Sequence, residues 1–405
     1  IAESELIEHK NFVIQLIKGV KFFKYIEGSE EFTDYLNDFT ENLGFDSWHI
    51  YLLRIADIYG NLINNNSDKS VIRHGIIINP PIAAIIDFFD SMSVNFDFNH
   101  QQLERLNTGQ IFDYKIFRER PLFKVSSNEY CFLNQNFFID KFYEALNFQF
   151  YNYIHTNKNY QTNYQGFKGT LSSEFSEQTL FFDIMEAILP GDNIKVKGTE
   201  YDYEYSDYYV RNSNQIFLFE FKDYLLKAEI KHSYNFDLVS NELKTKYIDE
   251  HGAVQLIQDI HKIENSEILF DKAINFQRLN NYIVFPIIVF TDYALNGTGI
   301  NYMLNREFTL LKNQEKFKMK VNNLIFMDLN TLIEFQELFI NGSFNLLKLC
   351  KDYLDYVSSK KYSRRHLQEL TNFSEFINLK IDESGIERIP PKLFETSLKE
   401  LFDVY

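Results

Sequence analysis

Hydrophobic and polar positions follow two different periods along this chain, which predicts a helical beginning, a mixed middle and a helical end. Apolar residues recur at helical spacing in residues 13–20, and again in residues 82–89 after a start signal at Pro80–Pro81. From about residue 345 onward the pattern predicts helices again, with a break at Pro390–Pro391. Helices are therefore expected to form most of both ends.

A hairpin and a linker are predicted between the helical beginning and the middle of the chain. Residues 120–133 predict two strands that turn at Ser126–Glu129, and a helix follows from about Asn136. The polar residues 155–168 carry no apolar period and predict a linker. We therefore expect a mainly helical domain over residues 1–160, with the hairpin inside it.

The middle of the chain alternates strands with helices, a pattern typical of a mixed sheet with helices on its faces. A helix capped by Ser173 or Ser176 precedes the first strand, and an amphipathic helix over Gly252–Ile263 follows the third. The expected strands are residues 193–197, the two arms of a hairpin over residues 203–223, residues 282–292 and the start of residues 323–335. The fold class expected for residues 165–340 is α/β, followed by a helical region over residues 341–405.

The hairpin over residues 203–223 gathers charged side chains on otherwise apolar strands. Asp207 opens the first strand, a polar turn follows at Arg211–Asn214, and the second strand carries Glu220 and Lys222. Because side chains alternate between the faces of a strand, Glu220 and Lys222 share one face. Charges on a largely buried strand are costly unless they have a partner, a metal or a chemical task. Two carboxylates beside an amine predict a divalent-cation site, because Mg²⁺ prefers oxygen ligands.

Composition and charge narrow the choice of partner. The chain of 405 residues is 45% hydrophobic and 17% aromatic, which is enough to bury a large core. Its formal net charge of −16 argues against a broad basic surface, so any contact with nucleic acid must be local. Two basic clusters, residues 316–320 and residues 360–366, could supply such contacts, although a solvated helix face is the simpler interpretation.

The sequence lacks the motifs of several other enzyme classes and the segments that direct a protein to a membrane or to secretion. It contains no Gly-rich phosphate loop, no dinucleotide fingerprint, no serine-hydrolase elbow and no zinc-binding His spacing. Cys131 and Cys350 stand alone, which is typical of buried small residues in a reducing compartment. No apolar run approaches the roughly 20 residues of a membrane span, and no signal peptide is visible. We therefore expect a cytoplasmic protein without a membrane partner.

The spacing of the charged residues in the hairpin matches a known signature. Asp207, twelve intervening residues and then Glu220-Phe221-Lys222 resemble the D-x(n)-E-x-K pattern of the PD-(D/E)XK nuclease superfamily, which has the restriction-endonuclease-like fold. Ser206 replaces the proline that commonly precedes the Asp. E-x-K also occurs elsewhere in this chain, but there no Asp-headed apolar strand lies just upstream.

The resemblance implies a phosphodiester hydrolase, an endonuclease or exonuclease that uses Mg²⁺ or Mn²⁺. The implied metal ligands are Asp207, Glu220, the carbonyl of Phe221, and Glu177 on the helix before the sheet. Lys222 is the implied residue that orients the attacking water or stabilises charge on phosphorus. Glu174, one turn before Glu177, is the alternative, or reserve, ligand. Either glutamate is explained equally well by the general preference for acidic residues at the start of a helix, where they complement the helix dipole.

The resemblance also implies partners, and it leaves a rival open. The implied substrate is DNA ahead of RNA, with a partner protein subunit or a homo-oligomer as a further option, and proteins of this layout include bacterial antiviral defence effectors. Some branches of the superfamily carry a glutamine on the helix after E-x-K, and Gln255 or Gln258 matches that position. The alternative is that both are ordinary polar surface residues. The rival is a catalytically weak or inactive nuclease-fold protein that serves as a binding or assembly subunit.

Overall fold

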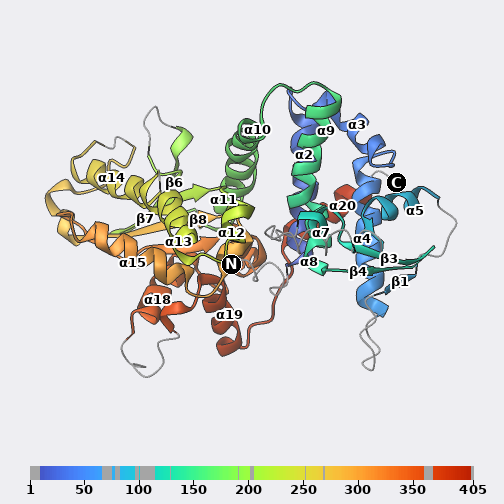
Figure 1. The fold of residues 1–405 in the computed structure, drawn as a ribbon. Helices are drawn as coiled ribbons and strands as arrows, with labels where there is room; N and C mark the ends of the chain where they lie inside the picture. The colour runs from blue at the N-terminus through green and yellow to red at the C-terminus, as the bar shows by residue number, and fades with distance from the viewer. Residues whose placement is uncertain are drawn as a thin grey trace. The chain divides into compact units, whose positions relative to one another are not determined.

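The fold is known from a computed structural model. It describes residues 10–65, 75–77, 83–95, 100, 115–127, 129–189, 191–200, 205–250, 252–267, 270–359 and 368–402. The chain forms two compact units, one containing Ser176–Pro391 and one containing Glu5–Phe175 with Lys392–Tyr405. Each unit has its own sheet and its own helices (Figure 1). The predicted domain boundaries at residues 160, 165 and 340 stay predictions, because compactness alone does not show independent folding.

The unit that contains Glu5–Phe175 is mainly helical, as predicted for this part of the chain. Its helices are α2 (Phe12–Gly28), α3 (Thr33–Asn42), α4 (Trp48–Asn65), α5 (Ala83–Ser91), α7 (Lys115–Glu119), α8 (Gln135–Ile139), η1 (Asp140–Phe142), α9 (Glu144–Asn157), α10 (Tyr164–Thr170) and α20 (Lys392–Phe402). Helix α20 packs against α2 and α4, so the last described residues complete the fold of the first. Phe150 makes edge contacts with Phe22, Phe32 and Phe39 in the core of this unit.

The predicted hairpin is present in this unit, within a small sheet that the sequence did not predict. Strands β3 (Leu122–Ser126) and β4 (Glu129–Phe132) pair in antiparallel fashion, and α8 begins next to the expected start at Asn136. The short strands β1 (Gly75–Ile77) and β2 (Ser93–Val94) extend the order to β1-β4-β3-β2. Residues 155–168, the expected linker, form the end of α9, a turn and the start of α10.

The larger sheet belongs to the unit that contains Ser176–Pro391. Its order is β10-β8-β7-β6-β5, with β9 beside β8. Strands β5, β6 and β7 form an antiparallel meander, whereas β8 runs parallel to β7, and β9 and β10 run parallel to β8. The strands are β5 (Ile194–Lys197), β6 (Tyr208–Asn212), β7 (Gln215–Lys222), β8 (Ile283–Phe290), β9 (Lys320–Val321) and β10 (Ile325–Asp328). The mixed sheet expected here is confirmed.

Helices surround this sheet (Figure 1). They are the π-helical segment η2 (Leu171–Phe182), α11 (Asp183–Ile188), α12 (Ala228–Lys231), α13 (Phe236–Lys244), the π-helical η4 (Thr245–Asp249), α14 (Ala253–Glu264), α15 (Ile300–Lys312), α16 (Leu329–Glu334), α17 (Gln336–Ile340), α18 (Leu346–Val357) and α19 (Phe373–Ser384). Short 3₁₀ turns are η3 (Gly198–Glu200), η5 (Phe276–Asn281), η6 (Tyr293–Asn296) and η8 (Gln368–Leu370). In the described part of the chain, no helix is long and apolar enough to cross a membrane.

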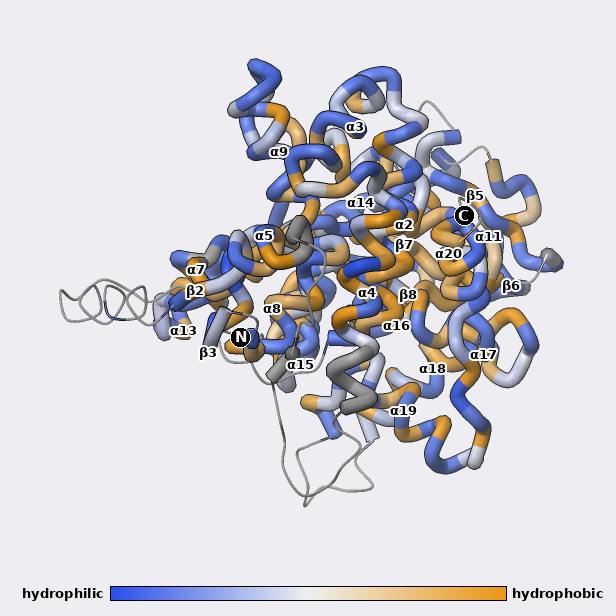
Figure 2. The backbone as a smooth tube through the Cα atoms, turned by 90° about the vertical axis from the view of Figure 1, so that its right-hand side faces the viewer, coloured by the Kyte–Doolittle hydropathy of each residue, from blue (hydrophilic) through white to orange (hydrophobic). Residues whose placement is uncertain are grey.

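The two faces of strand β7 pack against different helices. Leu218 lies in an apolar cluster with Leu256 and Ile260 of α14. On the opposite face, the ring of Phe221 stacks on Phe181 of η2 with 5.1 Å between the ring centroids. The alternation predicted for this strand is therefore the one observed, and the tube of Figure 2 is coloured hydrophobic along much of β7 and β8. Glu220 and Lys222 belong by register to the face covered by α14.

The expected helix cap at Ser173 or Ser176 is wrong. The helical backbone continues from α10 through η2 into α11, and the residues at both junctions, Leu171 and Phe182, have right-handed helical dihedrals. A cap needs an extended backbone, which neither serine has inside a continuous helical run. The Ser173 hydroxyl instead donates to the carbonyl of Gly169. Two further expectations, the start signal at Pro80–Pro81 and the basic residues 360–366, lie outside the described residues.

Candidate active site

The structure brings Asp207, Glu220 and Lys222 together in the larger sheet, at the place where β6 begins and β7 ends. Tyr208 pairs with Phe219 across the antiparallel strands, so Asp207 lies beside the end of β7 where Glu220 and Lys222 project. The Asp207 carboxylate accepts a hydrogen bond of 2.6 Å from the backbone N–H of Phe221. The ammonium group of Lys222 lies 2.6 Å from Glu220 Oε1. Local strand register alone therefore gathers two carboxylates and an amine.

Glu220 has the most unusual environment of the three. It is 1% exposed, and its Oε2 atom has no hydrogen-bond partner among the described residues. Burial raises its pKa well above the ordinary value, and the nearby carboxylates of Asp207 and Asp259 add to this effect, whereas Lys222 opposes it. A buried oxygen without a partner is costly, so it is a position where a cation or a reacting group would be favourable.

Asp207 shares this electrostatic environment. Burial raises its pKa, while the Phe221 N–H and the charge of Lys222 act in the opposite direction. In a strand, the N–H and the carbonyl of one residue point to the same edge, so the Phe221 carbonyl also faces the side of Asp207. The predicted third ligand therefore points to the correct side of β7.

Glu177 reaches the same group of charges from η2. Its carboxyl is half-buried, and its pKa is raised to about 7 by burial and by the charge of Asp207, with Lys222 opposing. Glu174, the reserve, instead accepts a hydrogen bond of 2.7 Å from Tyr25. The structure thus couples Glu177 to Asp207 and Lys222, whereas Glu174 bonds Tyr25.

A hydrogen-bonded clamp joins the elements that carry these residues. The Asp223 carboxylate accepts hydrogen bonds of 2.6 Å from the hydroxyl of Ser176 and of 2.6 Å from the hydroxyl of Thr291. Ser176 precedes Glu177, Asp223 follows Lys222, and Thr291 follows β8. One side chain therefore ties the helix and both strands together. From sequence, Ser176 was expected only as a helix cap, and no role was predicted for Asp223.

Asp259 is a further acidic residue that the sequence analysis missed. It is fully buried on α14, where its Oδ1 lies 3.0 Å from the ammonium group of Lys262 and its Oδ2 has no partner among the described residues. The backbone N–H of Ser206, which precedes Asp207, also bonds this carboxylate, and burial raises its pKa to about 6. A signal existed, because Asp259 falls on the apolar stripe of α14 beside Leu256 and Ile263.

The two glutamines that were predicted on α14 have different surroundings. The Gln255 amide lies 3.5 Å from the carbonyl of Tyr205, two residues before Asp207. Gln258 is exposed, and it has no hydrogen bond with these carboxylates among the described residues. Of the two, only Gln255 touches the segment that leads into the site, and the role taken from the resemblance stays a prediction for both.

The carboxylate oxygens of Asp207, Glu220 and Glu177 are chemically suitable ligands for a divalent cation. Among the described residues, no three His, Cys, Asp or Glu side chains lie close enough together to form a closed coordination shell. The charge of Asp207 nevertheless raises the pKa values of Glu177 and Glu220, and Glu220 Oε2 is a buried oxygen with no partner among the described residues. Oxygen atoms of this kind are the ligands that Mg²⁺ prefers, and a cation would relieve their mutual repulsion.

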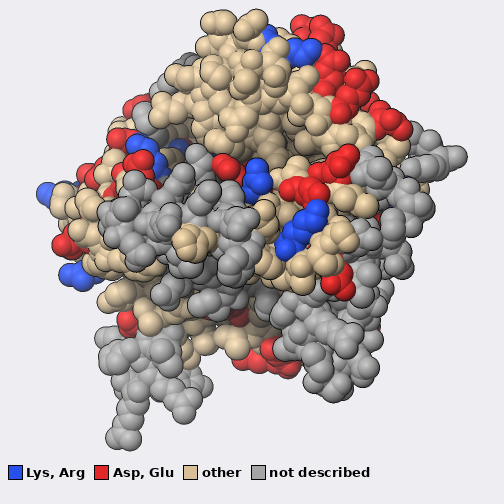
Figure 3. All heavy atoms as spheres, turned by 45° about the vertical axis from the view of Figure 1, so that its right-hand side comes forward, with Lys and Arg blue, Asp and Glu red and all other residues tan. Residues whose placement is uncertain are grey.

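On the face of the molecule drawn in Figure 3, the described residues form no broad positively charged surface. In Figure 3, acidic side chains form a continuous patch at one edge, while Lys and Arg side chains are scattered. This pattern agrees with the net charge of −16. Comparison with protein-family models, with curated proteins and with solved structures finds no match to this chain.

Proposed function

We propose that this protein is a metal-dependent nuclease that hydrolyses phosphodiester bonds, with DNA as the substrate. The observation that carries the proposal is the meeting of Asp207, Glu220 and Lys222 at one sheet edge, where Glu220 Oε2 is buried without a partner among the described residues. Perturbed carboxylates that cluster beside a lysine are typical of active sites.

The order of the elements supports the same proposal. A helix precedes three antiparallel strands, and a further helix leads to a strand that is parallel to the third. This is the order expected of the restriction-endonuclease-like core that the sequence resemblance implies. Asp207 immediately precedes the second strand, and Glu220 and Lys222 lie at the end of the third strand, which supports the proposal.

Each side chain has a role that follows from its position. Asp207, Glu220 and the carbonyl of Phe221 would hold Mg²⁺ or Mn²⁺, with Glu177 placed to bind a second ion or a water. When bound, the ion would polarise a phosphate and lower the pKa of a water molecule. Lys222 opposes the rise in the pKa values of the neighbouring carboxylates, and its ammonium group can orient the attacking water or stabilise charge on the phosphate.

Two substitutions test the proposal. Lys222→Ala leaves the carboxylates in place but removes the positioning cation, so we expect cleavage of plasmid or single-stranded DNA to fall by about 10²-fold or more. Asp207→Ala removes one hard ligand, and we expect it to abolish the metal-dependent activity. Cleavage is measured with Mg²⁺, with Mn²⁺ and in EDTA, and melting curves verify folding. Asp382→Ala, at an exposed carboxylate of α19, is the matched control and should keep full activity.

The rival function, a binding or assembly subunit without chemistry, predicts different results. In that case neither substitution changes any functional readout, and removal of a poorly partnered charge could raise the melting temperature. A parent protein that cleaves neither DNA nor RNA with either metal would contradict the nuclease proposal and favour this rival.

A further inference from the structure

A groove lies between helices α13 and α15 in the same unit as the carboxylates. Its volume is about 720 Å³, within the range of roughly 300–1,000 Å³ found for ligand sites. The segment that leads into α13 forms one wall with Tyr234 and Phe236, and α15 forms the other with Tyr302 and Arg306. The groove therefore combines aromatic rings with a cation.

The aromatic side chains of the groove are held out toward solvent. Tyr234 is 70% exposed, Phe236 is 73% exposed and Tyr302 is 44% exposed. None of the three rings has a ring contact with another described residue. The backbone of Tyr234 has a φ of 52°, in the left-handed region that bulky residues rarely adopt. Three exposed rings, one of them on a strained backbone at Tyr234, are unfavourable for folding alone, so they point to a binding role.

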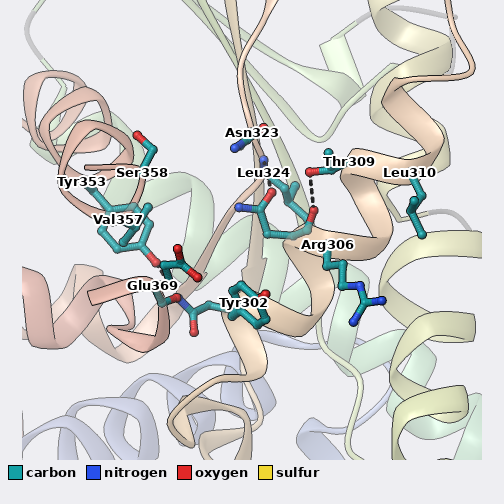
Figure 4. A pocket seen from close by; sticks show the side chains of 12 residues that line it. Tyr302, Arg306, Thr309, Leu310, Asn323, Leu324, Tyr353, Val357, Ser358 and Glu369 are labelled. Carbon is teal, nitrogen blue, oxygen red and sulfur yellow. Dashed lines mark hydrogen bonds between the residues drawn. The ribbon is translucent and has the colours of Figure 1, made fainter. Parts of the chain in front are cut away.

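Arg306 supplies a positive charge that the protein itself does not neutralise. It is exposed, and its guanidinium has no hydrogen bond or ion pair with the described residues. Figure 4 views the smaller pocket on the other side of α15, and there the Arg306 guanidinium points away from Glu369 and Tyr353. The nearest acidic neighbour in sequence, Glu307, lies 3.0 Å from Lys244. Arg306 is therefore available to an anionic ligand.

The groove adjoins the edge of the sheet that carries the candidate active site. Lys222 is the register partner of Phe290 at the end of β8. Two residues further on, Asp292 accepts a hydrogen bond of 2.9 Å from the backbone N–H of Leu226 and lies 3.5 Å from the ammonium group of Lys231. Lys231 lines the groove. The segment between Lys222 and α13 thus connects the strand that carries Glu220 and Lys222 to one wall of the groove.

We propose that this groove binds single-stranded DNA and guides it to the carboxylates, an inference that rests on the proposed nuclease function. Bases of a single strand would stack on Tyr234, Phe236 and Tyr302, and Arg306 would contact a phosphate. Stacking does not depend on sequence and needs unpaired bases, because in a duplex the faces of the bases are covered. Stacking is also compatible with an acidic protein, since it adds affinity for nucleic acid without requiring a broad basic surface.

Binding can be measured without cleavage, by fluorescence anisotropy of a labelled 15-nucleotide oligo(dT) in EDTA. The double substitution Tyr234→Ala and Phe236→Ala should weaken binding by about tenfold or more, because each base–aromatic stack contributes strongly. Arg306→Ala should reduce the slope of log K against log salt by about 0.7, and Arg306→Lys should restore it. Phe402→Ala and Arg388→Ala remove exposed side chains of the same types elsewhere and should change neither quantity.

Three outcomes overturn this inference: no binding of oligo(dT) by the parent, equal binding by the groove variants, or stronger binding of the matching duplex or of oligo(U). The nuclease proposal fails separately. Cleavage that depends on Asp207 but is unchanged in the groove variants would refute only the groove. Oligo(dT) binding that depends on the groove, without cleavage in any metal, would refute only the nuclease. Melting curves of each variant verify that the exposed substitutions leave the fold intact.

Discussion

Glu177 is the residue whose protonation is expected to change near neutral pH. Burial and the charge of Asp207 raise its pKa from 4.5 to about 7. The folded protein therefore takes up a proton more readily than the unfolded chain. The contribution of this carboxyl to stability is fully present below pH 4.5 and is lost as the pH rises to about 7.

Glu177→Gln tests this shift, because glutamine stays neutral. The free energy of unfolding of the variant, minus that of the parent, should increase between pH 5 and pH 8 in EDTA. One pKa unit corresponds to about 1.4 kcal/mol, but solvent screens this half-buried carboxyl, so the gain should be on the order of 1–2 kcal/mol. Denaturant titrations at several pH values measure it. Glu174→Gln, beside Tyr25, is the control, and a difference that does not vary with pH for Glu177→Gln would contradict the assignment.

Some site residues were predictable from sequence and others were not, for a physical reason. Asp207, Glu220 and Lys222 were found because they interrupt a local apolar alternation, which is visible within one hairpin. Asp223 and Asp259 act through partners that are far away in sequence, such as Thr291 for Asp223 and Ser206 for Asp259. Contacts of that kind depend on which strands and helices become neighbours, and no local pattern encodes them.

The same distinction holds for whole elements. Strands β5 to β8 and helix α14 lie close to their predicted ranges, because each has a period of its own. Strands β1 and β2 have three and two residues, too few for a period, and they exist through pairing with β4 and β3. The error at Ser173 and Ser176 arose because serine often begins helices, whereas here the helix had already begun at α10.

The clamp at Asp223 is the element-level feature that we expect to matter for function. It fixes η2 against the ends of β7 and β8, and so it positions Glu177 and Lys222 without touching a substrate. Asp223→Ala removes two hydrogen bonds and should cost about 1–3 kcal/mol of stability. It should also raise the Mg²⁺ concentration needed for half-maximal cleavage, because Glu177 is no longer held in place.

Asp223→Asn is the matched variant for this prediction. Its amide can still accept from one hydroxyl and donate to the other, so most of the clamp should persist. Unfolding curves and cleavage against Mg²⁺ concentration should therefore show a clearly smaller effect for Asp223→Asn than for Asp223→Ala. If both variants keep the parent's Mg²⁺ dependence, the clamp is structural only.

At the scale of the whole molecule, the net charge of −16 affects how metal binding has to be measured. A strongly acidic protein is destabilised by self-repulsion, and any salt screens that repulsion. Magnesium therefore raises the melting temperature partly by ionic strength alone. A specific site adds a second effect, because an ion that binds only the folded state stabilises it by mass action, by about 2.7 kcal/mol at a hundred times the dissociation constant.

We expect the melting temperature of the parent to be higher in MgCl₂ than in KCl of equal ionic strength, with EDTA as the reference. Asp207→Ala should lose this difference, since it removes a proposed ligand, while Asp382→Ala should keep it. The comparison isolates the site from general screening, because all three proteins carry nearly the same net charge. Equal melting temperatures of the parent in MgCl₂ and KCl would mean that the carboxylate cluster holds no ion. The buried Oε2 of Glu220, which has no partner in the part of the chain that the structure describes, would then need another explanation.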